Sequence, residues 1–355
     1  MNNIYFFIGT KAQAIKCLPL LRKFIAEDIC KVHIIDSGQH VEIVESIIDE
    51  FSQDVVRINL YENIVNISTF MQSFKWFYKF VVNYLILNRS SNLNIRDGMC
   101  IVHGDTLSTL MGLLWSKKNK LKVLHLESGL TSKKLLNPFP EEVIRRLVSK
   151  FSDILIAFDK DAFRYLKGKY KNKLVERISE NTIVETLNNQ ENEVIDKTAV
   201  VTLHRTENLI SKKNLERFIF FLNRLSETHS IEWFLHEPTI NYLAKYNLTI
   251  SKNIKTHDLV EHNAFVKRLS KADVVITDGG SIQEECYFLG KKTIIWRNTT
   301  ERSYALNDNM FVSKFKIEES LKFIDSHKNL VLQDIYKLKP SEEIFEFLKK
   351  LYFNN

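Results

Sequence analysis

Three acidic side chains stand where an α/β protein usually places groups that touch a ligand. Asp105 follows the apolar run 99–103, and Glu127 follows the apolar run 123–126. Glu141 opens a segment with helical periodicity. Carboxylates at the carboxyl ends of parallel strands point into the ligand crevice rather than into the core. Each alone could serve as a cap, but three that converge on one crevice would suit general acid–base catalysis.

Two histidines are candidates for the same crevice. His204 and Arg205 directly follow the apolar run 199–203, which favours a pocket over the core for both. His236 follows another apolar run and either lines the same crevice or is structural. No pattern typical of a Ser/His/Asp triad, a Walker loop or a metal cluster is present in the sequence.

The segment 273–302 has the pattern of an anion site. Residues 274–277 predict a buried parallel strand, Asp-Gly-Gly-Ser at 278–281 predicts a sharp turn, and Ser281 can cap the helix that follows. Free backbone N–H groups and the helix dipole would then point at one spot. The alternative is a tight connection that binds no ligand.

Two further features of this segment favour a ligand. Glu284 and Glu285 lie one turn into the predicted helix, where they could accept hydrogen bonds from ribose hydroxyls. A second polar turn, Thr-Thr-Glu-Arg at 299–302, follows the next strand. Both turns would converge at the carboxyl ends of neighbouring strands, where open α/β sheets bind ligands.

Strands and helices alternate through both halves of the chain, which predicts two Rossmann-like domains facing a central cleft. A length of 355 residues suits two domains. The stretch 164–197 is rich in Lys, Asn and Glu and poor in core pattern, so we place the junction there. We expect an N-terminal domain over 1–170, a C-terminal domain over 171–335 and a closing helix over 336–355.

An aromatic helix is predicted over 64–87, where Lys75 and Lys79 interrupt the apolar pattern. The two lysines exclude a membrane-crossing span of 18 apolar residues. The helix either packs on the sheet or offers a basic aromatic surface for peripheral contact with a membrane or a partner.

The composition indicates the cellular compartment of the protein but does not identify its ligand. The net charge of +7 suits anionic molecules, but no dense Lys/Arg block predicts binding of nucleic acid. Four cysteines without CxxC spacing indicate neither a zinc site nor a disulfide framework, so a reducing cytoplasm is the expected setting. The first nine residues predict a strand rather than a signal peptide.

Six motifs together resemble the UDP-N-acetylglucosamine 2-epimerase family. In chain order they are His103-Gly104-Asp105-Thr106, His125-Leu126-Glu127-Ser128-Gly129, Pro140-Glu141-Glu142 with Arg145, His204-Arg205 with Glu207-Asn208, Gln283-Glu284-Glu285, and Thr299-Thr300-Glu301-Arg302. The resemblance runs from Gly9 to Arg302 and implies an α/β GT-B fold. It implies that the C-terminal domain holds most of the UDP while the sugar faces the N-terminal domain.

The resemblance also implies a reaction and a site. UDP leaves C1 as the C2 proton is removed, and UDP re-adds with the opposite C2 configuration, or water adds instead. No metal or nicotinamide cofactor is implied, and a homodimer is expected. The implied acid–base residues are Asp105, Glu127, Glu141 and His204. The implied substrate-binding residues are Lys11, Lys16, Arg145, Arg205, His236, Gly280, Ser281, Glu285, Thr300 and Arg302, with Glu285 at the ribose and Gly280 and Ser281 at the diphosphate.

The chain departs from the family pattern near the expected phosphate and sugar contacts. Lys11 stands where the family has arginine, Ile144 where it has asparagine, and Asp-Ser-Gly-Gly is permuted at 278–281. Three functions therefore remain open. The first is an epimerase that acts on a UDP-HexNAc for surface polysaccharide supply, and the second is a GT-B glycosyltransferase. The third is a nucleotide-sugar sensor, which would gain nothing from three acidic groups that are costly to bury.

Overall fold

The computed structural model describes residues 2–39, 51, 54–61, 67, 70–89, 93, 95–131, 140–187, 194–300, 302, 306, 308–330 and 337–353. The chain divides into two compact units, which are Met1–Thr186 with Leu338–Asn355 and Leu187–Lys337. The division falls later than the boundary expected at residue 170, because strand β7 (Leu174–Arg177) pairs with β6 (Ile154–Ala157) of the first sheet. The closing helix, expected as a separate segment, belongs to the first unit.

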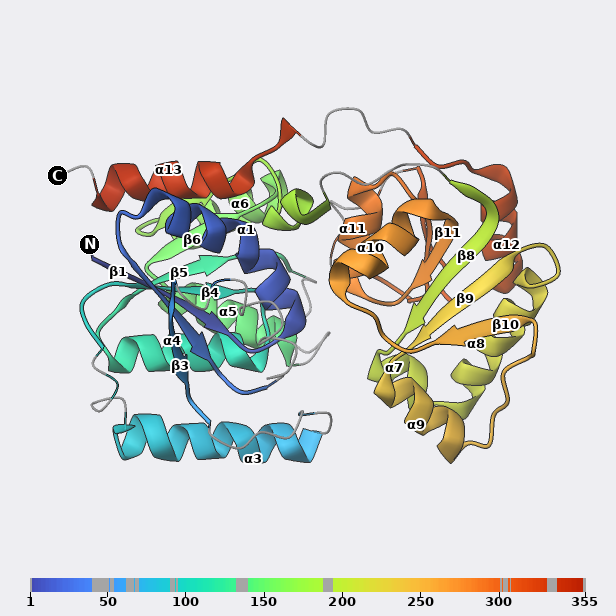
Figure 1. Ribbon diagram of the computed structural model, residues 1–355, viewed down its shortest axis with the longest axis horizontal. Helices are drawn as coiled ribbons and strands as arrows, with labels where there is room; N and C mark the ends of the chain where they lie inside the picture. Colours follow the sequence, from blue (N-terminus) through green and yellow to red (C-terminus); the bar gives the residue numbers. More distant parts are fainter. Residues whose placement is uncertain are drawn as a thin grey trace. The chain divides into compact units, whose positions relative to one another are not determined.

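The first unit is built on a parallel sheet whose order, over its described strands, is β3-β2-β1-β4-β5-β6-β7 (Figure 1). The order reverses between β1 and β4, so their carboxyl ends flank the crevice where open sheets of this kind bind ligands. The remaining strands are β1 (Asn3–Ile8), β2 (Lys31–Asp36), β3 (Val56–Asn59), β4 (Met99–His103) and β5 (Lys122–Leu126).

Alternate residues of β1 pack on opposite faces of this sheet. Ile4 and Phe6 join the core formed with α1 (Lys11–Glu27) and α13 (Pro340–Tyr352). Tyr5 and Phe7 join the core formed with α3 (Phe70–Phe80) and α4 (Leu107–Lys118). Helices therefore cover both faces of the sheet, which suits its continuous apolar strands. The other helical segments are η2, a π-helix (Val81–Ile86), α5 (Glu141–Phe151), α6 (Lys160–Lys169) and η4, a 3-10 helix (Thr182–Leu187).

The aromatic segment expected over 64–87 forms α3 and η2, while residues 62–66 and 68–69 lie outside the described part of the chain. Trp76 and Phe80 of α3 are buried against the sheet. Among the helices that the structure describes, none is both long and apolar enough to cross a membrane.

The second unit repeats the strand order of the first. Its described strands form a parallel sheet in the order β10-β9-β8-β11-β12-β13, which reverses between β8 and β11. The strands are β8 (Ile195–Leu203), β9 (Ser230–Leu235), β10 (Ile254–His257), β11 (Ala272–Thr277), β12 (Lys292–Ile295) and β13 (Met310–Val312). The helices are α7 (Thr206–Leu209), α8 (Lys212–Leu225), α9 (Glu237–Lys245), α10 (His262–Lys271), α11 (Gly280–Phe288) and α12 (Ile317–Ser326).

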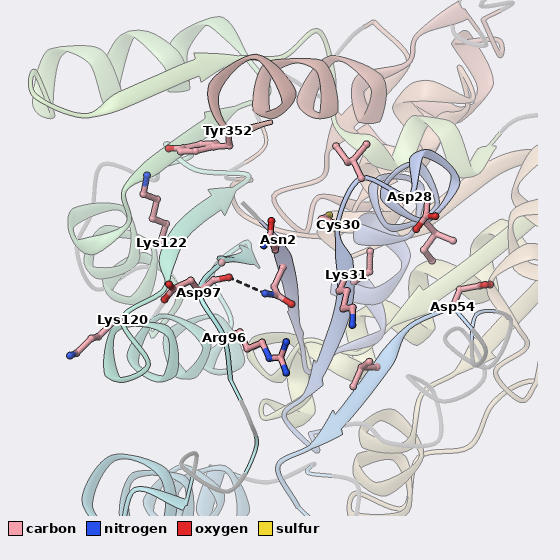
Figure 2. Close-up of a pocket in the computed structure, with 16 residues that line it drawn as sticks. Asn2, Asp28, Cys30, Lys31, Asp54, Arg96, Asp97, Lys120, Lys122 and Tyr352 are labelled. Atoms are coloured by element: carbon pink, nitrogen blue, oxygen red, sulfur yellow. Dashed lines mark hydrogen bonds between the residues drawn. The ribbon is translucent and has the colours of Figure 1, made fainter. Parts of the chain in front are cut away.

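A cavity of about 1450 Å³ lies at the amino ends of the first sheet's strands (Figure 2). Its lining includes Asn3, which donates its side-chain amide to the carbonyl oxygen of Asp97 at 3.0 Å, and Lys122, which lies 4.4 Å from the ring centre of Tyr352. The candidate residues from the sequence are not part of this lining. Of these candidates, Asp105 and Glu127 follow the carboxyl ends of β4 and β5, at the opposite edge of the first sheet.

Candidate active site

Glu127 is held by polar side chains from three other segments of the first unit. It directly follows β5 with a backbone φ of 57°, a left-handed conformation that non-glycine residues rarely adopt. Its Oε2 accepts hydrogen bonds from Lys16 Nζ of α1 and from Asn181 Nδ2, the latter at 2.9 Å. His103 Nε2, at the end of β4, lies 3.7 Å from the same oxygen. The ion pair is buried, since Lys16 is 2% exposed and Glu127 is 4% exposed.

The start of α1 brings Lys16 to this position. Thr10 and Gln13 form a capping box at the helix start, and Gln13 Nε2 donates to the carbonyl oxygen of His103 at 2.9 Å. Gly9 allows the close approach that this requires, because a Cβ there would lie 2.3 Å from Ser37 Oγ. The carboxyl ends of β1 and β4 are thereby joined at the reversal point of the sheet.

Arg145 organises a second buried cluster in the same unit. Its guanidinium forms an ion pair with Asp105, which follows β4, and Nη1 donates to Glu142 Oε2 at 3.0 Å. Glu142 is fully buried and also accepts hydrogen bonds from Arg146 and Thr131. Asp105 thus forms an ion pair with a buried cation, as Glu127 does.

Glu141, the remaining acid–base candidate of this half, and His125, a residue of the second motif, lie in different surroundings. Glu141 is the first residue of α5 and is half-buried, directly after Pro140 as the sequence predicted. His125 lies fully inside β5, where its Nε2 is 2.8 Å from the carbonyl oxygen of Gly104. Burial lowers the pKa of His125 to about 4, which keeps the ring neutral and suits a structural role inside the strand.

In the second unit, His204 and Arg205 follow β8 and Asp278 follows the neighbouring strand β11. The ring of His236 lies 4.5 Å from that of His204, centre to centre. This contact places the half-buried His236 beside His204. Burial lowers the pKa of His204, as do the nearby Arg205 and Arg297, while Asp278 opposes the shift.

The turn before α11 differs from the prediction in one respect. The helix begins at Gly280 with Gly279 as its N-cap residue, so Ser281 lies inside the first turn and does not cap it. Glycine at 280 leaves room for the Arg302 guanidinium, because a Cβ there would lie 2.3 Å from Nη1 of Arg302. The guanidinium therefore lies at the amino end of the helix, where the dipole is also positive. The buried Glu284 faces it, with Oε2 at 3.4 Å from Arg302 Nε.

The second polar turn contacts α11 through Thr300 and Arg302. Thr300 Oγ1 donates to Gln283 Oε1 at 2.7 Å and accepts from the backbone N–H of Arg302 at 3.1 Å. Glu285, on the same helix, is buried with its Oε1 2.8 Å from His262 Nε2. Its Oε2 is buried and has no hydrogen-bond partner among the described residues.

Sequence analysis missed the partners that hold these candidates. Asn181 lies in the stretch regarded as a junction, and Glu142 was passed over in favour of its neighbour Glu141. Asp278 could have been found, because it is a strand-end carboxylate like Asp105. Lys11 begins α1 and Arg205 is the N-cap residue of α7. Over the described ranges, no group of three His, Cys, Asp or Glu side chains is arranged to hold a metal ion.

Comparison with known proteins gives consistent matches. The sequence model of a family described as UDP-N-acetylglucosamine 2-epimerase matches residues 23–334. A relative of that name from Campylobacter jejuni is 24% identical, over 99% of this chain and 93% of the relative.

Two solved structures are similar over almost the whole chain. The UDP-GlcNAc 2-epimerase of Methanocaldococcus jannaschii, in complex with UDP-GlcNAc and UDP, has a TM-score of 0.81 and 25% identity, covering 98% of this chain and 99% of that one. The enzyme of that name from Neisseria meningitidis, bound to UDP-GlcNAc, has a TM-score of 0.79 and 22% identity, covering 99% of this chain and 100% of that one. The expected GT-B fold with two parallel-sheet α/β domains is confirmed.

Proposed function

We propose a function for this chain from one premise: it belongs to the UDP-N-acetylglucosamine 2-epimerase family. The reaction proposed is inversion at C2 of a UDP-N-acetylhexosamine, by elimination and re-addition of UDP. The family match favours this isomerase over the glycosyltransferase and the sensor that the sequence left open. The observation that supports it most is the placement of Asp105 and Glu127 at the ends of neighbouring strands, each against a buried cation.

We assign proton transfer at C2 to Asp105, Glu127 and Glu141, with His204 as the fourth acid–base group. A group that exchanges a proton with carbon must keep a fixed position, because misplacement by about 1 Å can cost about 100-fold in rate. The ion pairs with Lys16 and Arg145 hold the carboxylates of Glu127 and Asp105 in place. Lys16 and Arg145, which the sequence placed at the substrate, therefore also position the acid–base groups.

We assign UDP binding to the start of α11 and the turn that contacts it. Arg302 and the helix dipole offer positive charge to the diphosphate at Gly280 and Ser281. The buried, unpartnered Oε2 of Glu285 is suited to accept a hydrogen bond from a ribose hydroxyl. Thr300, tied to Gln283, holds the second turn against the helix.

Isotope exchange at C2 tests the proposed reaction. The protein is incubated with UDP-N-acetylglucosamine in heavy water, and the C2 proton of the sugar is followed by NMR. Loss of that signal, with a second C2 epimer appearing, is expected from elimination and re-addition. Free sugar without UDP re-addition would indicate the hydrolysing branch. UDP release or glycosyl transfer without exchange at C2 would overturn the proposal in favour of the glycosyltransferase.

We further propose that the protein is a cytoplasmic homodimer that pairs through one apolar face of the first unit. The five most exposed large hydrophobic side chains of the described chain, at 59–68% exposure, all lie on α3, η2 and the residue after: Met71, Phe74, Tyr78, Ile86 and Leu87. Exposed apolar surface of this kind marks interaction sites, and two-fold pairing is the commonest assembly of soluble proteins. The alternative to a second copy of the chain is a membrane surface that contacts the same face.

A further inference from the structure

Asp278 is a buried carboxylate at the reversal point of the second sheet. It follows β11 and is 1% exposed. Its oxygens accept hydrogen bonds from the backbone N–H of His204 at 3.1 Å and of Arg205 at 2.9 Å. A third donor is Asn208 Nδ2 at 2.8 Å. One side chain thus accepts hydrogen bonds from three residues of the segment that follows β8.

The same carboxylate faces the imidazole ring of His204. Asp278 Oδ1 lies 3.3 Å from His204 Nδ1, while the ring of His236 packs on His204 at 4.5 Å between centres. Gly279 closes another side, because a Cβ there would lie 3.0 Å from His204 Cε1. The His204 side chain nevertheless remains 34% exposed. The ring is therefore confined on several sides and still accessible to a ligand.

We propose that Asp278 is a positioning residue, which fixes the orientation and the tautomer of His204. His204 Nδ1 is buried and has no hydrogen-bond partner among the described residues, so the two groups interact through charge alone. A carboxylate at 3.3 Å attracts a proton to Nδ1 and leaves the lone pair of Nε2 for proton transfer. An acceptor-only group is needed here, since all three groups that hydrogen-bond to Asp278 are N–H donors. The catalytic consequence rests on the proposed epimerase function, but the state of the ring can be measured without any substrate.

NMR of the ring nitrogens tests the effect of Asp278 on His204. Protein labelled with ¹⁵N-histidine is titrated, and the His204 signals are identified by their loss in His204→Gln. The wild type is expected to show the Nδ1–H tautomer, and Asp278→Asn a shift towards the other tautomer. The His204 pKa should also fall in Asp278→Asn, because Asp278 raises it in the wild type.

A matched control comes from the other end of the same strand. Asp273, near the start of β11, also lies beside a histidine, with Oδ2 at 3.4 Å from His229 Nε2. Asp273→Asn should leave the His204 tautomer and pKa unchanged. Identical His204 signals in Asp278→Asn and wild type would overturn the proposal. A change of equal size in the Asp273 variant would also overturn it, by showing a general effect of loosened packing.

Turnover separates positioning from simple structural support. Asp278→Asn should lose about 10²–10⁴-fold in turnover per folded molecule, but little more when His204 is already Gln, because the two act as one unit. Losses that multiply fully would overturn the assignment. If Asp278→Asn does not fold, Asp278→Glu keeps the charge and should leave the His204 pKa close to that of the wild type, with reduced turnover. If the wild type shows no exchange at C2, the epimerase fails while the NMR result still decides the positioning role.

Discussion

At the scale of single residues, the buried cations Lys16 and Arg145 determine how much stability is lost when Glu127 or Asp105 is substituted. Glu127→Gln leaves Lys16, only 2% exposed, beside an uncharged amide. Breaking a buried ion pair in this way costs about 3–5 kcal/mol of the free energy of unfolding. Asp105→Asn should cost less, because Arg145 keeps its ion pair with Glu142. Urea unfolding of both variants checks the order, and equal losses would contradict it.

The same variants test the acid–base assignment. Asp105→Asn, Glu127→Gln and Glu141→Gln should each lower turnover per folded molecule by about 10²–10⁴-fold, the usual worth of a positioned acid or base. Their combined losses should be far from additive. UDP affinity should change little, because UDP is assigned to the other unit. Turnover within a few-fold of wild type in all three would refute the mechanism.

Glu285 carries a separate prediction about the nucleotide. At about 100 times its dissociation constant, UDP should stabilise the wild type by roughly 2.7 kcal/mol, since it binds only the folded chain. Glu285→Ala should reduce that gain by removing the ribose acceptor. Glu232→Ala, which removes a carboxylate paired with Arg268 in the same unit, is the matched control. Thermal shifts with UDP that do not differ between the two variants would remove Glu285 from the nucleotide site.

At the scale of elements, strand ends could be predicted from the sequence and their buried partners could not. A carboxyl end is visible as an apolar run that stops at a polar residue, which is how Asp105, Glu127 and His204 were found. Asn181 reaches Glu127 from a position 54 residues further along the chain, and no local pattern encodes that contact. β13 has three residues, too few for a periodic signal.

The amino ends of the second sheet supply a prediction about pH. Burial alone would raise the pKa of Asp273, but hydrogen bonds from His229 and Lys292 outweigh it and lower the pKa from its ordinary 3.8. The folded chain therefore binds this proton less readily than the unfolded chain. The resulting stabilisation is complete above about pH 4 and is lost as the pH falls through the folded value.

Asp273→Asn should consequently lower the free energy of unfolding by about 1–3 kcal/mol at pH 7, the cost of leaving buried donors without their charged acceptor. The difference from wild type should shrink at pH 3. Asp258→Asn, an exposed position in the same unit, is the control and should change little at either pH. A difference for Asp273→Asn that does not depend on pH would show that the ion pairs are not its source.

At the scale of the whole molecule, both units use one strand order, with the candidate residues gathered where that order reverses. Gly9 and Asp105 follow β1 and β4 in the first sheet, and His204 and Asp278 follow β8 and β11 in the second. This repetition explains why one rule about strand ends located candidates in both halves. Lys11 and Ile144 differ from the family pattern. We expect these two residues to make the substrate preference differ from that of the relatives.

The exposed face of α3 and η2 leads to a prediction about assembly. Phe74→Lys combined with Tyr78→Lys should convert a dimer into a monomer, because each partner would place two charges in an apolar contact. Phe220→Lys is the control, since Phe220 of α8 is 54% exposed on the second unit. Size-exclusion chromatography with light scattering measures the mass of each variant. A monomeric wild type that binds vesicles of anionic lipid, and loses that binding in the double variant, would assign the face to a membrane instead.

If the face binds a membrane, Lys75 and Lys79 would attract the anionic lipid. Lys75→Glu combined with Lys79→Glu should then abolish vesicle binding, whereas a dimer should stay intact in this variant.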